Sequence, residues 1–295
     1  MKKLLTTLAM SLLGASVLPA QQMTGGFLDD YIIHIKPDRR ADFDTISKKV
    51  AEANRKAKGD SFIAFEQVYG PDYTVMYVSA RENFAAIENG MNSFMAAMNE
   101  AYGVGGMKKF LADSTPTIQS AAARLRRRRI DLSVNFPKDM NAYYQLVGNT
   151  RYSRISELRV KAGHTQQFEH LAIEAKEAME KSDSNLISTV SQAVAGAPAG
   201  TFYMTTLAPN MAAFDSGPSL RKVIGEDEYM KWSKEMSECV DFSESFIYHV
   251  NAEWSNPPKE VADVAPDYWR PKVVSMAKPK PKAAAAAATT KTGTN

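Results

Sequence analysis

The sequence predicts an α+β protein made of two successive units, each with the element order β-α-β-β-α-β and one antiparallel sheet. Two observations support this fold class. Strand-like and helix-like segments follow one another in the same order before and after residues 135–149. In each unit, a turn containing glycine and proline separates the second and third strand-like segments. With 295 residues, 44% of them hydrophobic, the chain is long enough for two such domains.

The N-terminus has the three parts of a secretory signal peptide. Lys2 and Lys3 precede an apolar run from Leu4 to Leu18, and the small residue Ala20 precedes polar sequence. The run is shorter than the roughly 20 apolar residues that a membrane crossing needs, which makes an anchor the weaker alternative. We therefore expect residues 1–20 to be a signal peptide cleaved after Ala20. The mature protein is expected to be periplasmic or secreted, with no transmembrane segment.

The first unit is predicted to span residues 27–134. A strand over 31–35 stops at Pro37, and a helix over 38–56 follows, with apolar residues three and four positions apart. Strands over 61–68 and 74–79 form a hairpin. A second helix starts near Asn83 and carries a stripe of Met and aromatic residues, which is typical of a core-facing helix. An extended run over 125–132 is expected to close the unit.

The second unit, over residues 150–255, repeats this order. Its elements are expected at 155–161 (strand), around Phe168 to Ala178 (helix), 186–194 and 201–207 (hairpin), 219–240 (long helix) and 246–252 (closing strand). Lys36 and Phe43 match Lys161 and Phe168 at one offset of 125, which favours a tandem duplication. Residues 135–149 are expected to be a connector. Residues 256–295, rich in Pro, Lys and Ala, are expected to be a solvated tail.

Charge and composition exclude several classes of function. The formal net charge is +3, but it becomes −4 for residues 21–271 once the signal and tail lysines are left out. An acidic body gives no reason to expect nucleic acid, despite the run Arg124 to Arg129. That run is better explained as a solvated edge strand, with anion capture by two alternate arginines as the alternative. The lone Cys239 rules out an intramolecular disulfide and is expected to be buried and inert. Neither a metal site nor a cofactor motif is found, so none is predicted.

The order of elements in each unit resembles the ferredoxin-like fold. The short first helix, the hairpin and the interrupted second helix make each unit similar to the dimeric α+β barrel superfamily, which includes antibiotic-biosynthesis monooxygenases and NIPSNAP-like proteins. That resemblance implies two sheets facing each other as a pseudo-dimeric barrel within one chain, which would be a monomer or a higher oligomer. The superfamily includes cofactor-free oxygenases, haem enzymes and proteins of no known chemistry. His164 and His170 do not share a helical face, so they do not suggest the axial ligand of the haem branch.

Strand alternation assigns candidate site residues within this fold. Ile33, Ile35, Leu158 and Val160 should pack under the helices, so the residues between them should point into the barrel. The candidates for a polar cavity are His34, Glu157 and Arg159, with Arg127 and His249 as weaker members; Tyr248 is the alternative to His249. If the sheets are open instead, the same residues simply face solvent.

Three functions remain open on this evidence. The leading hypothesis is an exported module that binds a small anionic or amphipathic molecule or another protein, because no catalytic motif is matched. The alternative is a cofactor-independent oxygenase in which His34 acts as a base and Arg159 holds an anionic substrate. A third is a structural component of the cell envelope, attached through the basic tail.

Overall fold

The computed structural model describes residues 25–70, 73–182, 185–215 and 219–270. The signal-peptide prediction and most of the predicted tail lie outside these residues. Among the described residues, no helix is both long enough and apolar enough to cross a membrane.

The first half of the chain, residues 27–134, contains four strands and three helices. Their order is β1 (Phe27–Ile35), α1 (Arg40–Ala57), β2 (Phe62–Tyr69), β3 (Thr74–Arg81), α2 (Phe84–Tyr102), α3 (Gly106–Ser114) and β4 (Ile118–Arg128). The predicted order of elements is confirmed. The closing strand starts seven residues earlier than the predicted residue 125, because the chain leaves α3 through one short turn and enters β4 directly.

The second half, residues 150–256, follows the same order. It contains β5 (Tyr152–Val160), α5 (Thr165–Lys181), β6 (Ser188–Ala195), β7 (Thr201–Ala208), α6 (Leu220–Ile224), α7 (Glu226–Cys239) and β8 (Val240–Asn256). The predicted long helix over 219–240 is broken at Gly225, whose φ of 86° lies in the region that favours glycine. β8 has 17 residues and extends well beyond the predicted 246–252.

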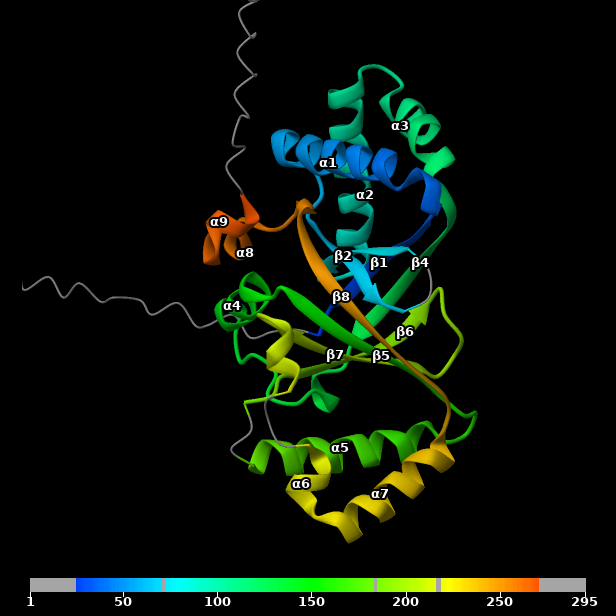
Figure 1. Cartoon of the computed structure of the whole chain (residues 1–295), viewed down its shortest axis with the longest axis vertical. Coiled ribbons are helices and arrows are strands. Elements are labelled where there is room, and N and C mark those ends of the chain that lie inside the picture. Colours follow the sequence, from blue (N-terminus) through cyan, green and yellow to red (C-terminus); the bar gives the residue numbers. More distant parts are fainter. Residues whose placement is uncertain (1–24, 71–72, 183–184, 216–218, 271–295) are drawn as a thin grey trace, which may run out of the picture.

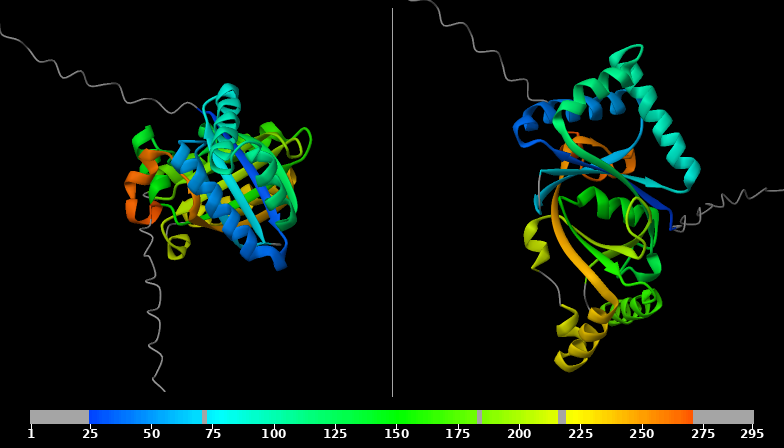
Figure 2. Two further views of the ribbon diagram at one scale, coloured as in Figure 1. Left: turned by 90° about the horizontal axis from the view of Figure 1, so that it is seen from above. Right: turned by 90° about the vertical axis from the view of Figure 1, so that its right-hand side faces the viewer.

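The eight strands form one closed barrel in which every neighbouring pair is antiparallel, in the order β1-β3-β2-β8-β5-β7-β6-β4. Each half supplies four adjacent strands. Pairing of β2 with β8 and of β4 with β6 joins the two sets and closes the barrel. The helices α1–α3 cover the strands of the first half and α5–α7 cover those of the second, on opposite sides of the barrel (Figures 1 and 2).

Apolar side chains pack both outside and inside the barrel. Ile33 and Ile35 lie under α1 beside Phe43, while Leu158 and Val160 pack with Phe168 of α5, as strand alternation predicts. A separate cluster inside the barrel includes Phe65, Met76, Ile155, Tyr203 and Tyr248. These side chains fill part of the barrel interior.

Three further helices lie at one end of the barrel. α4 (Met140–Asn149) belongs to the predicted connector, and α8 (Lys259–Val264) and α9 (Pro266–Trp269) follow β8 (Figure 1). Residues 259–269 therefore do not form a solvated tail. Val261, Ala262 and Trp269 are buried, and the Trp269 indole donates a hydrogen bond to the carbonyl of Gly148 on α4 at 2.9 Å. These contacts fix α8 and α9 against α4 over the barrel end.

Candidate functional site

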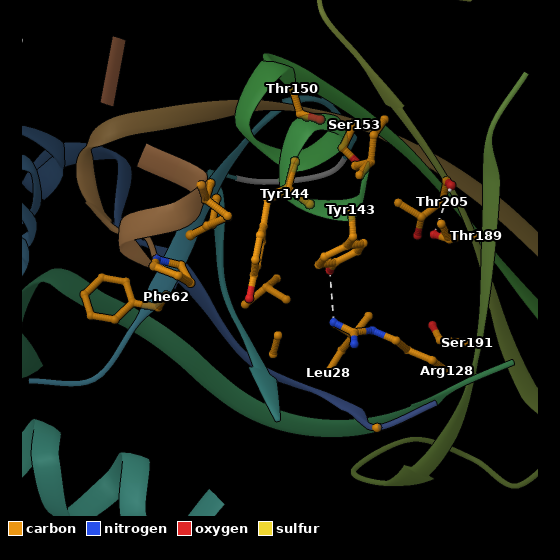
Figure 3. Close-up of a pocket in the computed structure, with 18 of the residues that line it drawn as sticks. Leu28, Phe62, Arg128, Tyr143, Tyr144, Thr150, Ser153, Thr189, Ser191 and Thr205 are labelled. Atoms are coloured by element: carbon orange, nitrogen blue, oxygen red, sulfur yellow. Dashed lines mark hydrogen bonds between the residues drawn. The ribbon is translucent and has the colours of Figure 1, made fainter. Parts of the chain in front are cut away.

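A cavity of about 510 Å³ lies inside the barrel at the end that α4, α8 and α9 cover, and we call it the end cavity. Strands of both halves and all three helices contribute to its wall. Most of the lining is apolar, with polar side chains gathered on one side (Figure 3). A cavity of this size suits a small organic molecule.

Arg128 is the half-buried guanidinium of the end cavity. It belongs to the end of β4, and its backbone amide donates to the Gly26 carbonyl at 3.1 Å. Nη2 donates to the hydroxyl of Tyr143 on α4 at 2.9 Å, and the guanidinium carbon lies 5.0 Å from the centre of the same ring (Figure 3). Within the described residues, no carboxylate lies within ion-pair distance of Arg128. The two acids in the lining, Glu82 and Glu260, are exposed.

Arg126, two residues earlier on β4, also lines the end cavity, but its charge is neutralised. Its guanidinium contacts Asp30 of β1, with Nη2 at 2.7 Å from Oδ1 and Nε at 2.6 Å from Oδ2. Nη1 donates to Ser191 Oγ at 3.1 Å. Asp30 is 0% exposed and Arg126 is 2% exposed. Burial at this depth requires such pairing, because an isolated charge would be strongly destabilising.

A second ion pair continues this network toward the middle of the barrel. Arg124 Nη1 lies 3.3 Å from Glu157 Oε2 and donates to the Tyr203 hydroxyl at 3.1 Å, while its Nε lies 3.7 Å from Asp30. Two arginines and two carboxylates thus balance in charge. Burial raises the pKa of Tyr203, and it raises the pKa of Tyr248 to about 12, so both remain phenols at neutral pH.

The predicted site residues do not gather around the end cavity. Glu157 points into the barrel, where Arg124 neutralises it. His34 and Arg159 occupy the eighth positions of β1 and β5, six residues beyond the cavity-lining second positions, or about 20 Å along each strand. His34 Nδ1 lies 3.0 Å from Thr74 Oγ1, and the Arg159 guanidinium stacks over Phe242 at 4.9 Å. Neither residue lines the end cavity.

Two of the predicted positions point away from the barrel interior. Arg127 is exposed and reaches Gln192 at 3.5 Å, because the inward positions of β4 are those of Arg124, Arg126 and Arg128. The His249 ring lies 5.1 Å from that of Tyr152, outside the barrel. The inward residue is its neighbour Tyr248, which packs in the interior cluster. Neither Arg127 nor His249 lines the end cavity.

Arg128 is the residue that sequence reasoning missed. The run from Arg124 to Arg129 places arginines on both faces of the strand, so alternation alone could not choose between Arg127 and Arg128. An available signal was Leu125, whose apolar side chain marks the odd-numbered face as the one outside the charged network. α4 was also missed as part of the wall, although its Tyr143-Tyr144 pair is visible in the sequence.

Known structures share this architecture. A proposed monooxygenase from Fusobacterium nucleatum matches 77% of this chain and 92% of its own, with a TM-score of 0.50 and 11% identity. A proposed monooxygenase from Lactobacillus acidophilus matches 77% of this chain and 94% of its own (TM-score 0.48, 10% identity). A heme-binding protein from Thermus thermophilus matches 80% and 95% (TM-score 0.43, 11% identity).

Sequence comparison adds nothing to these structural likenesses. No model of a known family and no curated protein matches the chain. Sequence identities near 10% support a shared architecture but give no information about activity. The closed barrel of eight antiparallel strands with helices outside it is the dimeric α+β barrel fold, and this chain has that fold.

Proposed function

We propose that this protein binds a small amphipathic molecule with an anionic group in the end cavity. The apolar lining would bury the body of such a molecule, and Arg128 would hold its anionic group. Of the arginines that line the cavity, Arg81 is paired with Asp60 and Arg126 with Asp30, which leaves Arg128 as the cation that an incoming anion can pair with. In the part of the chain that the structure describes, Arg128 has no counterion although it lies in a mostly apolar cavity, and this observation carries the proposal.

Haem, which binds one of the structural neighbours, does not fit the end cavity well. The haem iron of proteins is held most often by His or a Cys thiolate, and in some proteins by Met or Tyr. None of His34, His164, His170 and His249 lines the cavity, and Cys239 is buried under α5 in a different core. Tyr143, the phenol nearest the cavity's cation, is already engaged by Arg128. We therefore derive no haem chemistry for this chain.

The oxygenase alternative with His34 as base stays a prediction without added support. His34 and Arg159 lie toward the other end of the barrel, on strands that are not neighbours: β1 lies between β3 and β4, and β5 between β8 and β7. A substrate held by Arg128 would lie too far from His34 for proton transfer, which needs about 3 Å between heavy atoms or one bridging water.

The proposal is tested with two dyes that share one aromatic skeleton. 1-Anilinonaphthalene-8-sulfonate carries a sulfonate, and N-phenyl-1-naphthylamine lacks it. Both fluoresce more strongly when they leave water. For the Arg128→Gln variant we expect the sulfonated dye to bind roughly tenfold more weakly or worse, because a hydrogen bond to a charged group contributes about 1.5–3 kcal/mol. The neutral dye should bind as before.

Arg127→Gln is the matched control, since it removes the same charge one residue away on the outer face of the same strand. It should change neither dye's affinity. Equal weakening of the sulfonated dye in both variants would show a general surface-charge effect and would refute the role of Arg128. Failure of the folded wild-type protein to bind either dye would refute the binding function.

Two finer points belong to the same proposal. We propose that the two halves arose by tandem duplication and act as the two subunits of a pseudo-dimer, which is supported by the equal order of elements in residues 27–134 and 150–256. We also propose that the protein is exported, on the strength of residues 1–20 alone. Sequencing the N-terminus of protein recovered from outside the cytoplasm tests export, and a start at Gln21 is expected.

A further inference from the structure

Strands β1 to β3 of the first half and β5 to β7 of the second half differ in chemistry at four equivalent positions of the end-cavity lining, although the second half also supplies the apolar Ile155 and Leu207. Equivalent inward positions can be compared by counting residues from the start of each strand. They are the second residue of β1 and β5, the second and fourth residues of β2 and β6, and the fifth residue of β3 and β7. At all four places the first half has an apolar side chain and the second half a hydroxyl. The pairs are Leu28 and Ser153, Ile63 and Thr189, Phe65 and Ser191, and Val78 and Thr205.

On the wall formed by the strands of the second half, some hydroxyl groups do not use all of their hydrogen-bonding capacity within the described residues. Ser153 is 0% exposed, and its Oγ has no hydrogen-bond partner in the described part of the chain. Ser191 Oγ accepts from Arg126, which leaves its own proton available. Thr189 donates to the backbone carbonyl of Thr205 at 3.3 Å. These side chains lie on the same side of the cavity (Figure 3). Because an unmade hydrogen bond inside a protein is costly, this wall favours an occupant that carries polar groups.

The wall formed by β1, β2 and β3 is mostly apolar and offers such groups few partners. Leu28, Ile63, Phe65 and Val78 have no polar side-chain atoms, and Val147 of α4 and Val261 of α8 extend the apolar surface. The polar first-half residues of the lining are Ser61, Arg81 and Glu82 beside β2 and β3, and Arg126 and Arg128 on β4; Arg81 is paired with Asp60 and Arg126 with Asp30. A hydroxyl placed against this wall would lose its hydrogen bonds to water without replacement.

We propose that the end cavity selects a rigid, facially amphipathic ligand: a fused-ring carboxylate with hydroxyls on one face and hydrocarbon on the other. This inference rests on the proposed function, because Arg128 would hold the carboxylate. It deepens that function by adding a requirement that a flexible fatty acid does not meet. A methylene chain would bury hydrocarbon against Ser153 and Thr205 and leave their hydroxyls unsatisfied.

The test uses two bile acids as probes, chenodeoxycholate and ursodeoxycholate. They have the same ring skeleton, the same carboxylate and two hydroxyls each, and they differ only in the face that carries one hydroxyl. Chenodeoxycholate has both on one face. Measured by calorimetry below the concentrations at which micelles form, chenodeoxycholate should bind about tenfold more tightly or better, because ursodeoxycholate must bury one hydroxyl against apolar side chains.

Thr205→Val and its neighbour Thr206→Val form the matched pair of variants. Both replace a hydroxyl by a methyl group on β7, but Thr205 lines the cavity and Thr206 is on the outer face. Thr205→Val, alone and combined with Ser153→Ala, should reduce the preference for chenodeoxycholate at least about threefold, as expected for loss of a neutral hydrogen bond. Thr206→Val should leave the preference unchanged. Circular dichroism establishes that each variant is folded.

The outcomes separate this inference from the function it rests on. Equal affinities for the two bile acids, or a preference that Thr205→Val does not change, would overturn facial selection. Binding of the sulfonated dye through Arg128 without binding of either bile acid would overturn it as well, while the proposed function stands. Loss of both dye and bile-acid binding in the folded wild-type protein would remove the proposed function itself.

Discussion

Replacing Asp30 by Asn should be among the most destabilising single changes in this protein. Asp30 is fully buried and is the carboxylate that neutralises Arg126. The Asp30→Asn variant keeps the shape of the side chain but leaves the buried Arg126 and the half-buried Arg124 with the single carboxylate of Glu157. Removing one partner of a buried ion pair costs about 3–5 kcal/mol. For a domain of roughly this length, that loss lowers the melting temperature by about 6–20 °C.

The double variant Asp30→Asn with Arg126→Met distinguishes lost charge balance from lost packing. It restores an equal number of positive and negative groups in the network, and a buried ion pair replaced as a whole often costs little. We expect it to be more stable than Asp30→Asn alone. Urea denaturation followed by circular dichroism gives the free energies of unfolding for a double-mutant cycle. A loss below about 1 kcal/mol in Asp30→Asn, or strictly additive losses in the double variant, would refute this reasoning.

Three more variants test other parts of the structure. Burial lowers the pKa of His249 below 6.5, so the stability that its neutral form provides is complete above about that pH and is lost as the pH falls. Between about pH 8 and pH 5 the melting temperature should therefore fall less in His249→Gln than in wild type. Parallel curves of melting temperature against pH would contradict this. Gly148→Ala should destabilise the protein by roughly 1–3 kcal/mol, although alanine favours helices. The new Cβ would lie 2.5 Å from Val264 Cβ and would disturb the contact of Trp269 with α4. An unchanged melting temperature would count against this reasoning. Cys239 is 0% exposed, and burial raises the pKa of its thiol. It should therefore react with a thiol reagent only when the protein unfolds. Fast labelling of the native protein would be inconsistent with that burial.

The fold was largely predictable because local patterns and topology agree. Strand alternation correctly placed Ile33 and Leu158 under the helices, since a period of two leaves only one face for the core. Element order then limited the sheet topologies to very few. The break at Gly225 was missed because apolar residues continue at helical spacing on both sides of it, although the glycine itself was a visible signal.

The site was less predictable because it depends on long-range placement. Alternation shows whether His34 faces inward, but it does not show which end of the barrel is covered. That depends on α4, α8 and α9, whose residues had been assigned to a connector and a tail. The inward face of β4 was hard to assign for a different reason: arginines at both 127 and 128 make the strand polar on each side, and apart from the signal of Leu125 the choice depends on the register with β1 and β6.

The two places where the halves join have a consequence for folding. Separated from each other, residues 27–134 would expose one long side of β2 and of β4, and residues 150–256 one long side of β6 and of β8. Such bare backbone amides and carbonyls recruit other chains and promote aggregation. Expression of either piece by itself should therefore give insoluble material, whereas co-expression of both should recover soluble protein, because each piece supplies the missing neighbours of the other.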